Sequence, residues 1–191
     1  WIAELRPDLR MPHDSEPHAD ISIAHCPERV LPGRIMIEMI TNDRIVGGLT
    51  PRCAARAASI YRVFAQGEIL VTDAASAEMA KLVENAYRDV NIAFANELSL
   101  ISESLHIDVW EVIRLANRHP RVNILSPGPG VGGHCIPVDP WFIVAAAPQL
   151  ARVIRTAREV NDHRPHHVAE QVIGKARRFR APSIACLGLT F

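Results

Sequence analysis

The feature that most constrains the fold is a run without glycine or proline that extends from residue 74 to residue 105. Its apolar residues recur every three or four positions, which is the spacing of one side of an α-helix. These residues are Met79, Leu82, Val83, Ala86, Val90, Ala93 and Phe94. A helix of roughly 30 residues is about 45 Å long, too long for the crossover of a small sheet. The run therefore predicts the spine of a helical domain.

Short strand-like segments precede this run, at 21–25, 44–48 and 68–72. Between the last two, Thr50 is a candidate N-cap with Pro51 at the first helical position, and Gly67 is a candidate stop. A strand, helix, strand order is typical of a parallel sheet.

Shorter helices are expected after the long run. Asp108 and Glu111 form a capping-box pattern that opens a helix, and Pro120 must end it. Further helical segments are expected at 140–147, at 148–161 and after Pro165, followed by a last apolar run at 184–189 that is typical of a strand.

Charge and cysteine content exclude several functional classes. Acidic and basic side chains number 21 each and the pI is about 7.3, so there is no electrostatic footprint for nucleic acid or an anionic membrane. No apolar run approaches the roughly 20 residues of a membrane span. Four cysteines without C-x-x-C spacing argue against zinc and disulfides and favour a reducing cytoplasm. A start at Trp1 and an end at Phe191 suggest a fragment of a longer protein.

A glycine-rich loop at 126–140 contains Cys135, four residues before Asp139 in the sequence. Glycines allow positive φ and a close approach of backbone N–H groups to a ligand. The pattern favours a nucleophilic cysteine, although a tight turn with a buried thiol is the alternative. Asp139 could lie near the sulfur or could cap the helix that begins at Pro140.

A second polar group lies on the long helix, where Lys81, Asn85 and Arg88 share one face. A solvated helix surface is the ordinary interpretation. The chain, however, contains only two lysines against nineteen arginines, and a lysine supplies a compact charge whose pKa falls on desolvation.

Glu28 lies just after the first strand. It is either a charged residue of a surface loop or a carboxylate in the crevice at the strand ends.

Five segments together resemble the nucleotide-sugar 6-dehydrogenases, which form the UDP-glucose/GDP-mannose dehydrogenase family. They are residues 26–33 (CPERVLPG), 78–85 (EMAKLVEN), 113–123 (IRLANRHPRVN), the cysteine loop and 158–162 (REVND). The resemblance implies NAD-dependent oxidation of a sugar's primary alcohol to a carboxylate. Within the family the likeness is greatest to members that act on UDP-N-acetylmannosamine. It also implies a homodimer formed through the helical domain.

The resemblance implies roles for individual residues. It makes Cys135 the nucleophile and gives catalytic roles to Lys81, Asn85, Glu28 and Asp139, with Glu28 helping water to attack a thioester. Its implied substrate contacts are Arg29, Val30, Lys81, Asn85, Arg88, His119, Arg121 and Gly132. For His119 and Arg121, a routine cation-rich helix end is the alternative. No metal site is expected, and His163, His166 and His167 are not at metal-ligand spacing.

The resemblance predicts an α/β fold with three parts. Residues 1–72 are the tail of a Rossmann-like parallel sheet, 73–168 a central all-helical domain, and 169–191 a linker helix with the first strand of a second, UDP-binding α/β domain. No G-x-G-x-x-G follows an early strand, so the residues that bind the cofactor phosphates are not assigned.

Three alternatives remain open. The first is a sister enzyme acting on UDP-glucose or UDP-N-acetylglucosamine, against which the stretch at 117–121 argues. The second is a cysteine-dependent hydrolase or acyltransferase that needs no NAD, which would require a histidine base. The third is an inert helical dimerisation module.

Overall fold

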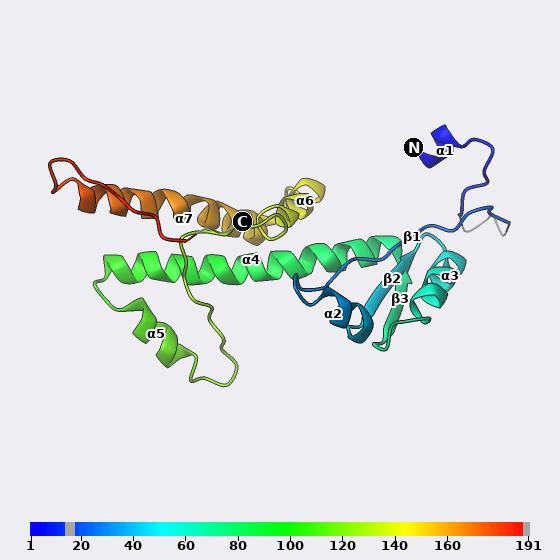
Figure 1. The fold of residues 1–191 in the computed structure, drawn as a ribbon, viewed down its shortest axis with the longest axis horizontal. Helices are drawn as coiled ribbons and strands as arrows, with labels where there is room; N and C mark the ends of the chain where they lie inside the picture. Colours follow the sequence, from blue (N-terminus) through cyan, green and yellow to red (C-terminus); the bar gives the residue numbers. More distant parts are fainter. Residues whose placement is uncertain (14–17, 189–191) are drawn as a thin grey trace. The chain divides into compact units, whose positions relative to one another are not determined.

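The computed structural model describes residues 1–13 and 18–188. The chain forms two compact units, residues 1–81 and 82–191. The boundary between them falls inside the long helix α4, which runs from Ala74 to Ser104 (Figure 1). The helix predicted from the glycine- and proline-free run is therefore confirmed almost to the residue. In the described part of the chain, no helix combines the length and the apolar character that crossing a membrane requires.

The first unit contains a three-stranded sheet in the order β1-β2-β3. Strand β2 (Arg44–Gly48) pairs in parallel with β3 (Ile69–Asp73), as the sequence predicted, with Arg44 opposite Ile69. Strand β1 is only Ala24–His25, and it runs antiparallel to β2. Two short helices that the sequence analysis did not anticipate complete this unit, α1 (Ile2–Leu5) and α2 (Ile35–Thr41).

Helix α3 (Pro51–Tyr61) connects β2 to β3. It begins as predicted, because the Thr50 side chain accepts a hydrogen bond from the Cys53 N–H and Pro51 occupies the first turn. It ends at Tyr61, whereas the sequence analysis expected it to continue toward Gly67. Gly67 instead packs against the backbone of Asn42, which an added Cβ would approach to 2.5 Å.

The core of the first unit lies where α3 and the start of α4 pack on β2. Its buried residues are Val46, Cys53, Ala54, Ala58 and Ala77. Small residues predominate because the backbones approach closely: a Cβ on Gly48 would lie 2.3 Å from the Ala54 nitrogen.

The second unit contains most of α4 with α5 (Val109–Ala116), α6 (Asp139–Ala146) and α7 (Arg152–Ala176). Asp108 caps α5 by accepting from the Trp110 N–H, but Glu111 pairs with Arg114, so the reciprocal half of the capping box does not form. A small apolar cluster of Ala86, Ile143, Val144 and Ala151 joins α4, α6 and the residue that precedes α7.

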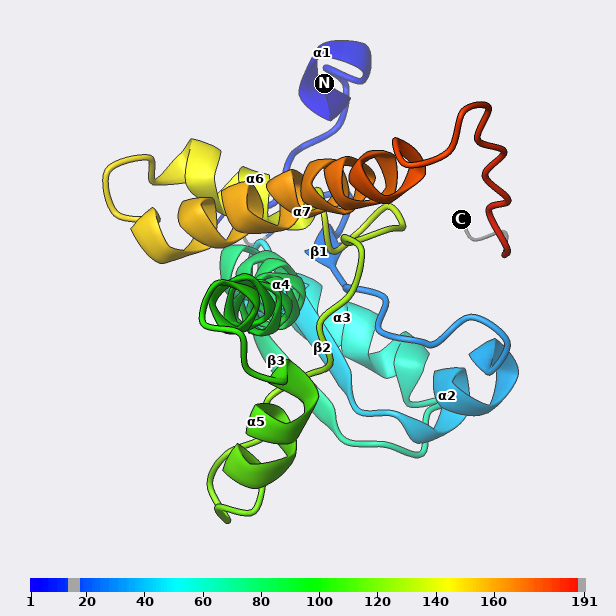
Figure 2. The ribbon, with the colours of Figure 1, turned by 90° about the vertical axis from the view of Figure 1, so that its left-hand side faces the viewer.

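Helix α7 differs from the sequence expectation, because it passes through Pro165 without a break. An interior proline costs about 3 kcal/mol in an isolated helix. Contacts on either side of it hold α7 in place: Arg158 bonds to Asp89 of α4, and His167 bonds to Glu103. Figure 2 shows α7 as one continuous helix. Local sequence shows the proline but not these contacts, because Asp89 and Glu103 are distant in the sequence.

The last expected strand does not form within the described residues. Residues 184–188 are irregular, and residue 189 lies outside the described residues. A strand requires a hydrogen-bonded neighbour, and no described segment pairs with this one.

Candidate active site

The loop that carries Cys135 combines left-handed backbone with an exposed thiol. Gly130 and Gly133 have φ values of 153° and 85°, in the region that favours glycine. Cys135 is exposed, as is Gly132. The Cys135 carbonyl accepts hydrogen bonds from the N–H groups of Val138 (3.1 Å) and Asp139 (2.8 Å). This turn leads directly into α6, so the cysteine lies one turn before a helix and not in a buried core.

Asp139 and Asn85 are brought together from positions 54 residues apart. The Asn85 Nδ2 donates to the Asp139 Oδ2 over 2.6 Å, and Asn85 is buried. Asp139 is the first residue of α6, and its neighbour Val138 is the N-cap, with no side-chain cap bond. Of the two interpretations left open by the sequence, the cap is therefore wrong. The carboxylate holds the Asn85 amide beside the turn that contains the Cys135 carbonyl.

Lys81 and Arg88 lie one turn on either side of Asn85 on α4. Lys81 is half-buried and Arg88 is exposed. Because Asn85 between them is buried, this helix face is not uniformly solvated. Lys81 belongs to the first unit and Cys135 to the second, so the proximity of these two side chains remains a prediction.

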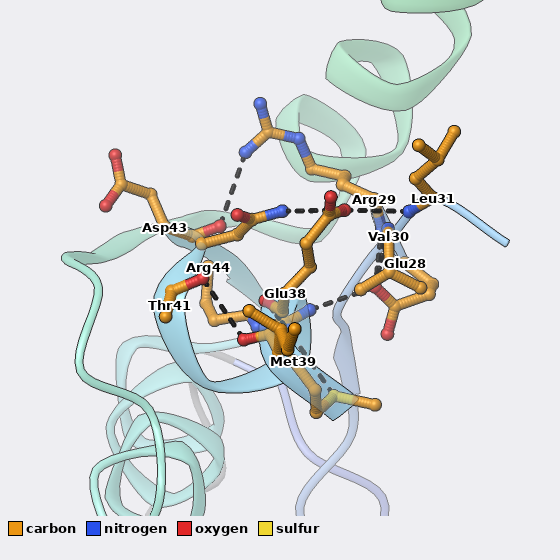
Figure 3. Close-up of polar contacts among 11 residues, drawn as sticks. Glu28, Arg29, Val30, Leu31, Glu38, Met39, Thr41, Asp43 and Arg44 are labelled. Atoms are coloured by element: carbon orange, nitrogen blue, oxygen red, sulfur yellow. Dashed lines mark hydrogen bonds and ion pairs between the residues drawn. The ribbon is translucent and has the colours of Figure 1, made fainter. Parts of the chain in front are cut away.

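Glu28 receives several hydrogen bonds in the first unit (Figure 3). Its Oε1 accepts from the Arg29 N–H (2.7 Å), the Val30 N–H (3.1 Å) and the Arg44 Nη1 (3.0 Å). Partial burial alone would raise the pKa of the Glu28 carboxyl, but the backbone N–H of Arg29 and the guanidinium of Arg44 together outweigh burial and lower the pKa. Glu28 is thus an ionised carboxylate whose second oxygen has no part in these bonds.

Arg44 was not anticipated as a site residue. It lies at the start of β2, where a polar residue ordinarily marks the exposed end of a strand, yet it is buried. Its Nη2 donates to the Glu38 carbonyl and contacts the Met39 sulfur, and its guanidinium lies 6.0 Å from the centre of the Tyr61 ring. No local sequence signal distinguishes a buried arginine of this kind from a surface one.

The remaining predicted contact residues divide into two groups. Arg29 and Val30 belong to the Glu28 cluster through their backbone N–H groups, and Arg29 also donates through Nη1 to the Asp43 carbonyl. His119 and Arg121 follow α5, are exposed, and are linked by a bond from the Arg121 N–H to the His119 Nδ1 (3.3 Å). The contact of this exposed segment with a substrate remains a prediction.

The described residues form neither a metal site nor the phosphate-binding part of a dinucleotide site. They contain no group of three or more His, Cys, Asp or Glu side chains arranged around a metal ion. The unit of β2, α3 and β3 has the parallel topology of a dinucleotide-binding sheet. At the carboxyl end of β2 the space beside Gly47 is occupied by Ala77, and the space beside Gly48 is occupied by the backbone of Ala54. These residues therefore form part of the sheet and not a phosphate-binding loop.

Two models of one protein family match the chain in sequence order. The NAD binding domain of the UDP-glucose/GDP-mannose dehydrogenase family matches residues 4–65, and the central domain matches residues 75–163. The chain belongs to the UDP-glucose/GDP-mannose dehydrogenase family. The order of the two matches agrees with the sheet of the first unit and the helices of the second.

Relatives in the UDP-glucose/GDP-mannose dehydrogenase family match the whole chain. It is 62% identical to an NDP-N-acetyl-D-galactosaminuronic acid dehydrogenase of Ralstonia nicotianae and 61% identical to the UDP-N-acetyl-D-mannosamine dehydrogenase of Escherichia coli K12. The alignments include all of this chain but 45% and 47% of those proteins. The chain therefore spans about half the length of the curated relatives it matches.

A solved structure from the same family has the same fold. The UDP-N-acetyl-mannosamine dehydrogenase of Staphylococcus aureus superposes with a TM-score of 0.79 at 49% sequence identity, over 90% of this chain and 40% of that one. The α/β fold class, with a Rossmann-like sheet followed by a helical domain, is confirmed by these matches.

Proposed function

We propose that the protein containing this chain is an NAD-dependent dehydrogenase that oxidises the C6 alcohol of UDP-N-acetyl-D-mannosamine to the uronic acid. One observation carries the proposal: an exposed cysteine, Cys135, lies on a glycine-rich turn whose next residues include Asp139, bonded to the buried Asn85 of α4. An exposed thiol four residues before a carboxylate that orients an amide donor suits covalent catalysis at a carbonyl group. Family membership supplies the reaction class.

The N-acetylated sugar is supported by the names of the relatives. Proteins named for N-acetylmannosamine and for N-acetylgalactosaminuronic acid match at almost the same identity. A UDP-N-acetylgalactosamine-type substrate is therefore the second candidate, in place of the UDP-glucose and UDP-N-acetylglucosamine alternatives raised from the sequence.

The residues of the chain would act as follows. The Cys135 thiolate adds to the C6 aldehyde formed in the first oxidation and gives a thiohemiacetal. Loss of hydride from this adduct leaves a thioester, and water releases the carboxylate and regenerates the thiol. NAD, when bound, accepts the hydride in both oxidations. The balance is alcohol, two NAD⁺ and water to carboxylate, two NADH and three protons.

Asn85 and Lys81 stabilise the oxyanion of the adduct. The Asn85 amide has two N–H groups, one of which is directed to Asp139, and the other is available to the substrate. Removing one such donor from an oxyanion site typically costs about 3 kcal/mol of transition-state stabilisation. Glu28, held ionised by its three donors, orients the hydrolytic water with its second oxygen.

We further infer a homodimer formed through the helical unit, and a reaction in the cytoplasm, where nucleotide sugars and NAD are available. Balanced charge supports a small-molecule substrate over a nucleic acid.

The test uses the full-length protein with Cys135 replaced by serine. Serine keeps the size of the side chain but is much harder to ionise than a thiol. We expect the wild type to release two NADH per UDP-N-acetylmannosamine and Cys135→Ser to fail in the second oxidation. A serine variant that released two NADH per sugar at a rate near wild type would exclude covalent catalysis by Cys135.

A second experiment separates the two candidate substrates. It compares kcat/KM of the wild type for UDP-N-acetylmannosamine and for UDP-N-acetylgalactosamine.

A further inference from the structure

Four buried polar side chains connect α4 to α7 within the second unit. Asp89, Asn96, Arg158 and Asn161 are each at most 1% exposed. Asp89 Oδ1 accepts from Arg158 Nη1 (2.5 Å) and from Asn161 Nδ2 (2.8 Å). Asn161 Oδ1 in turn accepts from Asn96 Nδ2 (2.9 Å). A buried polar cluster of this size is costly unless its members are paired.

The hydrogen-bond chain ends on the backbone of the cysteine loop. Asn96 Oδ1 accepts from the Gly128 N–H (2.9 Å), and the Gly128 carbonyl accepts from Arg164 Nε (2.8 Å). Two residues further along, a Cβ on Gly130 would lie 2.8 Å from Cγ of Pro165. The start of the loop is therefore held between α4 and α7 (Figure 2).

The other end of the loop is held by α4 as well, through the bond between Asn85 and Asp139. Asn85 and Asn96 are eleven residues apart, about three helical turns, so they lie on the same face of α4 and about 16 Å apart along its axis. The eleven steps of chain from Gly128 to Asp139 could span up to about 36 Å if extended, which exceeds the distance between the two anchors along α4. The loop is thus fixed at both ends, and Cys135 lies near the second end, in the turn whose carbonyl accepts from Val138 and Asp139.

The direction of each amide follows from the partners of Asn161. The Asp89 backbone carbonyl can only accept, and Asn161 Nδ2 donates to it (3.0 Å) as well as to Asp89 Oδ1 (2.8 Å), so the Asn161 oxygen must point toward Asn96. Asn96 must then direct its NH₂ group to Asn161 and its oxygen to the Gly128 N–H. A leucine at position 96 would leave the Asn161 oxygen and the Gly128 N–H without this partner.

We propose that Asn96 is a positioning residue for Cys135, because it transmits the fixed orientation of the Asp89–Asn161 pair to the start of the cysteine loop. The role of the cysteine rests on the proposed function, whereas the anchoring of the loop does not. Without this anchor the start of the loop loses its bond to α4 and keeps its contacts with Arg164 and Pro165 of α7, and the thiol samples more positions relative to the Asn85 amide.

The test compares Asn96→Leu, which removes both the acceptor and the donor of the amide in a side chain of similar shape, with Asn91→Leu in the full-length protein. Asn91 is a matched control, since it lies on the same helix and its side chain, among the described residues, bonds to the Tyr87 carbonyl of its own preceding turn. Hydrogen exchange of the peptide 126–138 reports on loop anchoring, with the peptide 51–61 of α3 as the internal reference. Steady-state kinetics reports on the position of the thiol.

For Asn96→Leu we expect exchange of the loop peptide to be about tenfold faster, with α3 unchanged. Since misplacement of a reacting group lowers turnover by up to about 100-fold, kcat should fall while KM stays near wild type. The proposal is overturned if loop exchange and kcat both remain within about twofold of Asn91→Leu.

If Asn96→Leu increases exchange throughout the second unit, Arg164→Ala decides, because Arg164 is only half-buried and reaches the loop through a single bond. The same local signature in Arg164→Ala supports anchoring, and an unchanged loop overturns it. A wild-type protein without dehydrogenase activity would refute the proposed function, while the exchange measurements would still decide the anchoring.

Discussion

At the scale of single residues, the contacts of Glu28 determine its protonation state. One oxygen is bonded to two backbone N–H groups and to the buried guanidinium of Arg44. Donors of this kind stabilise the charged form of a carboxyl group. A carboxylate held ionised is suited to orienting a water molecule by accepting its hydrogen bond. It is less suited to removing a proton at neutral pH, because a lowered pKa makes it a weaker base.

The lowered pKa of Glu28 predicts how its contribution to stability depends on pH. A carboxyl whose pKa is lower in the folded state contributes stability that is fully present above its ordinary pKa of 4.5 and is lost as the pH falls through the lowered value. The free energy of unfolding of the wild type should therefore exceed that of Glu28→Gln near pH 7, and the difference should shrink below pH 4.5.

Urea unfolding of the full-length protein at a series of pH values measures this difference. Glu170→Gln, which replaces an exposed carboxylate of α7 outside this network, is the control. A Glu28→Gln difference that stayed constant or grew on acidification would show that Arg44 and the backbone donors do not stabilise the ionised form.

The sequence could predict some site residues better than others. The glycine content around Cys135 favoured a nucleophile over a buried thiol; Cys135 is exposed, and its role as a nucleophile stays a prediction. The two interpretations of Asp139 could not be separated, because its partner Asn85 lies 54 residues away. Arg44, Asn96 and Asn161 were missed for the same reason: their burial and their partners arise only when distant elements pack.

At the scale of elements, local signals predicted where helices begin and tertiary packing determined where they end. Thr50 and Asp108 cap α3 and α5 through bonds to nearby backbone N–H groups, and such bonds depend only on neighbours in the sequence. The end of α3 and the continuity of α7 through Pro165 depend on contacts with other segments. The long helix was predicted well because its periodicity extends over many turns.

Two glycines in different elements should respond to alanine in opposite ways. A Cβ on Gly48 of β2 would lie 2.3 Å from the Ala54 nitrogen and 2.5 Å from the Thr50 carbonyl. Backbone atoms cannot move aside freely, so Gly48→Ala should destabilise the protein by about 1–3 kcal/mol. Gly174 of α7 has open space around it, and Gly174→Ala should stabilise by about 0.5–1 kcal/mol, because alanine loses less conformational freedom in a helix.

Urea midpoints of the two variants and the wild type, measured side by side in the full-length protein, provide the check. Equal and small shifts for both variants would mean that the close approach of α3 to β2 at Gly48 is not a tight contact.

At the scale of the whole molecule, the two sides of α4 differ within the second unit. Asn85, Asp89 and Asn96 lie on the side that meets the cysteine loop and α7. Nearly opposite, exposed apolar side chains form a stripe at Val83, Tyr87, Phe94 and Ile101, whose spacings of four and seven place them on one face. Phe94 also lines an open apolar groove of about 720 Å³ with residues at the start of α7.

This stripe predicts the assembly of the full-length protein. Tyr87 and Phe94 are 69% and 53% exposed, and a contiguous apolar surface of this kind ordinarily meets a partner. A twofold-related copy would place the same stripe against itself, because a symmetric dimer uses one surface twice. Light scattering of the full-length protein should therefore give the mass of a dimer.

Phe94→Glu should shift the population toward monomer, because two buried carboxylates would face each other without counter-charges. Val63→Glu, which changes an apolar residue of the first unit that is 84% exposed, should leave the dimer intact. A wild-type monomer with full activity, or a Phe94→Glu dimer as stable as the Val63→Glu dimer, would show that the α4 stripe is not the interface.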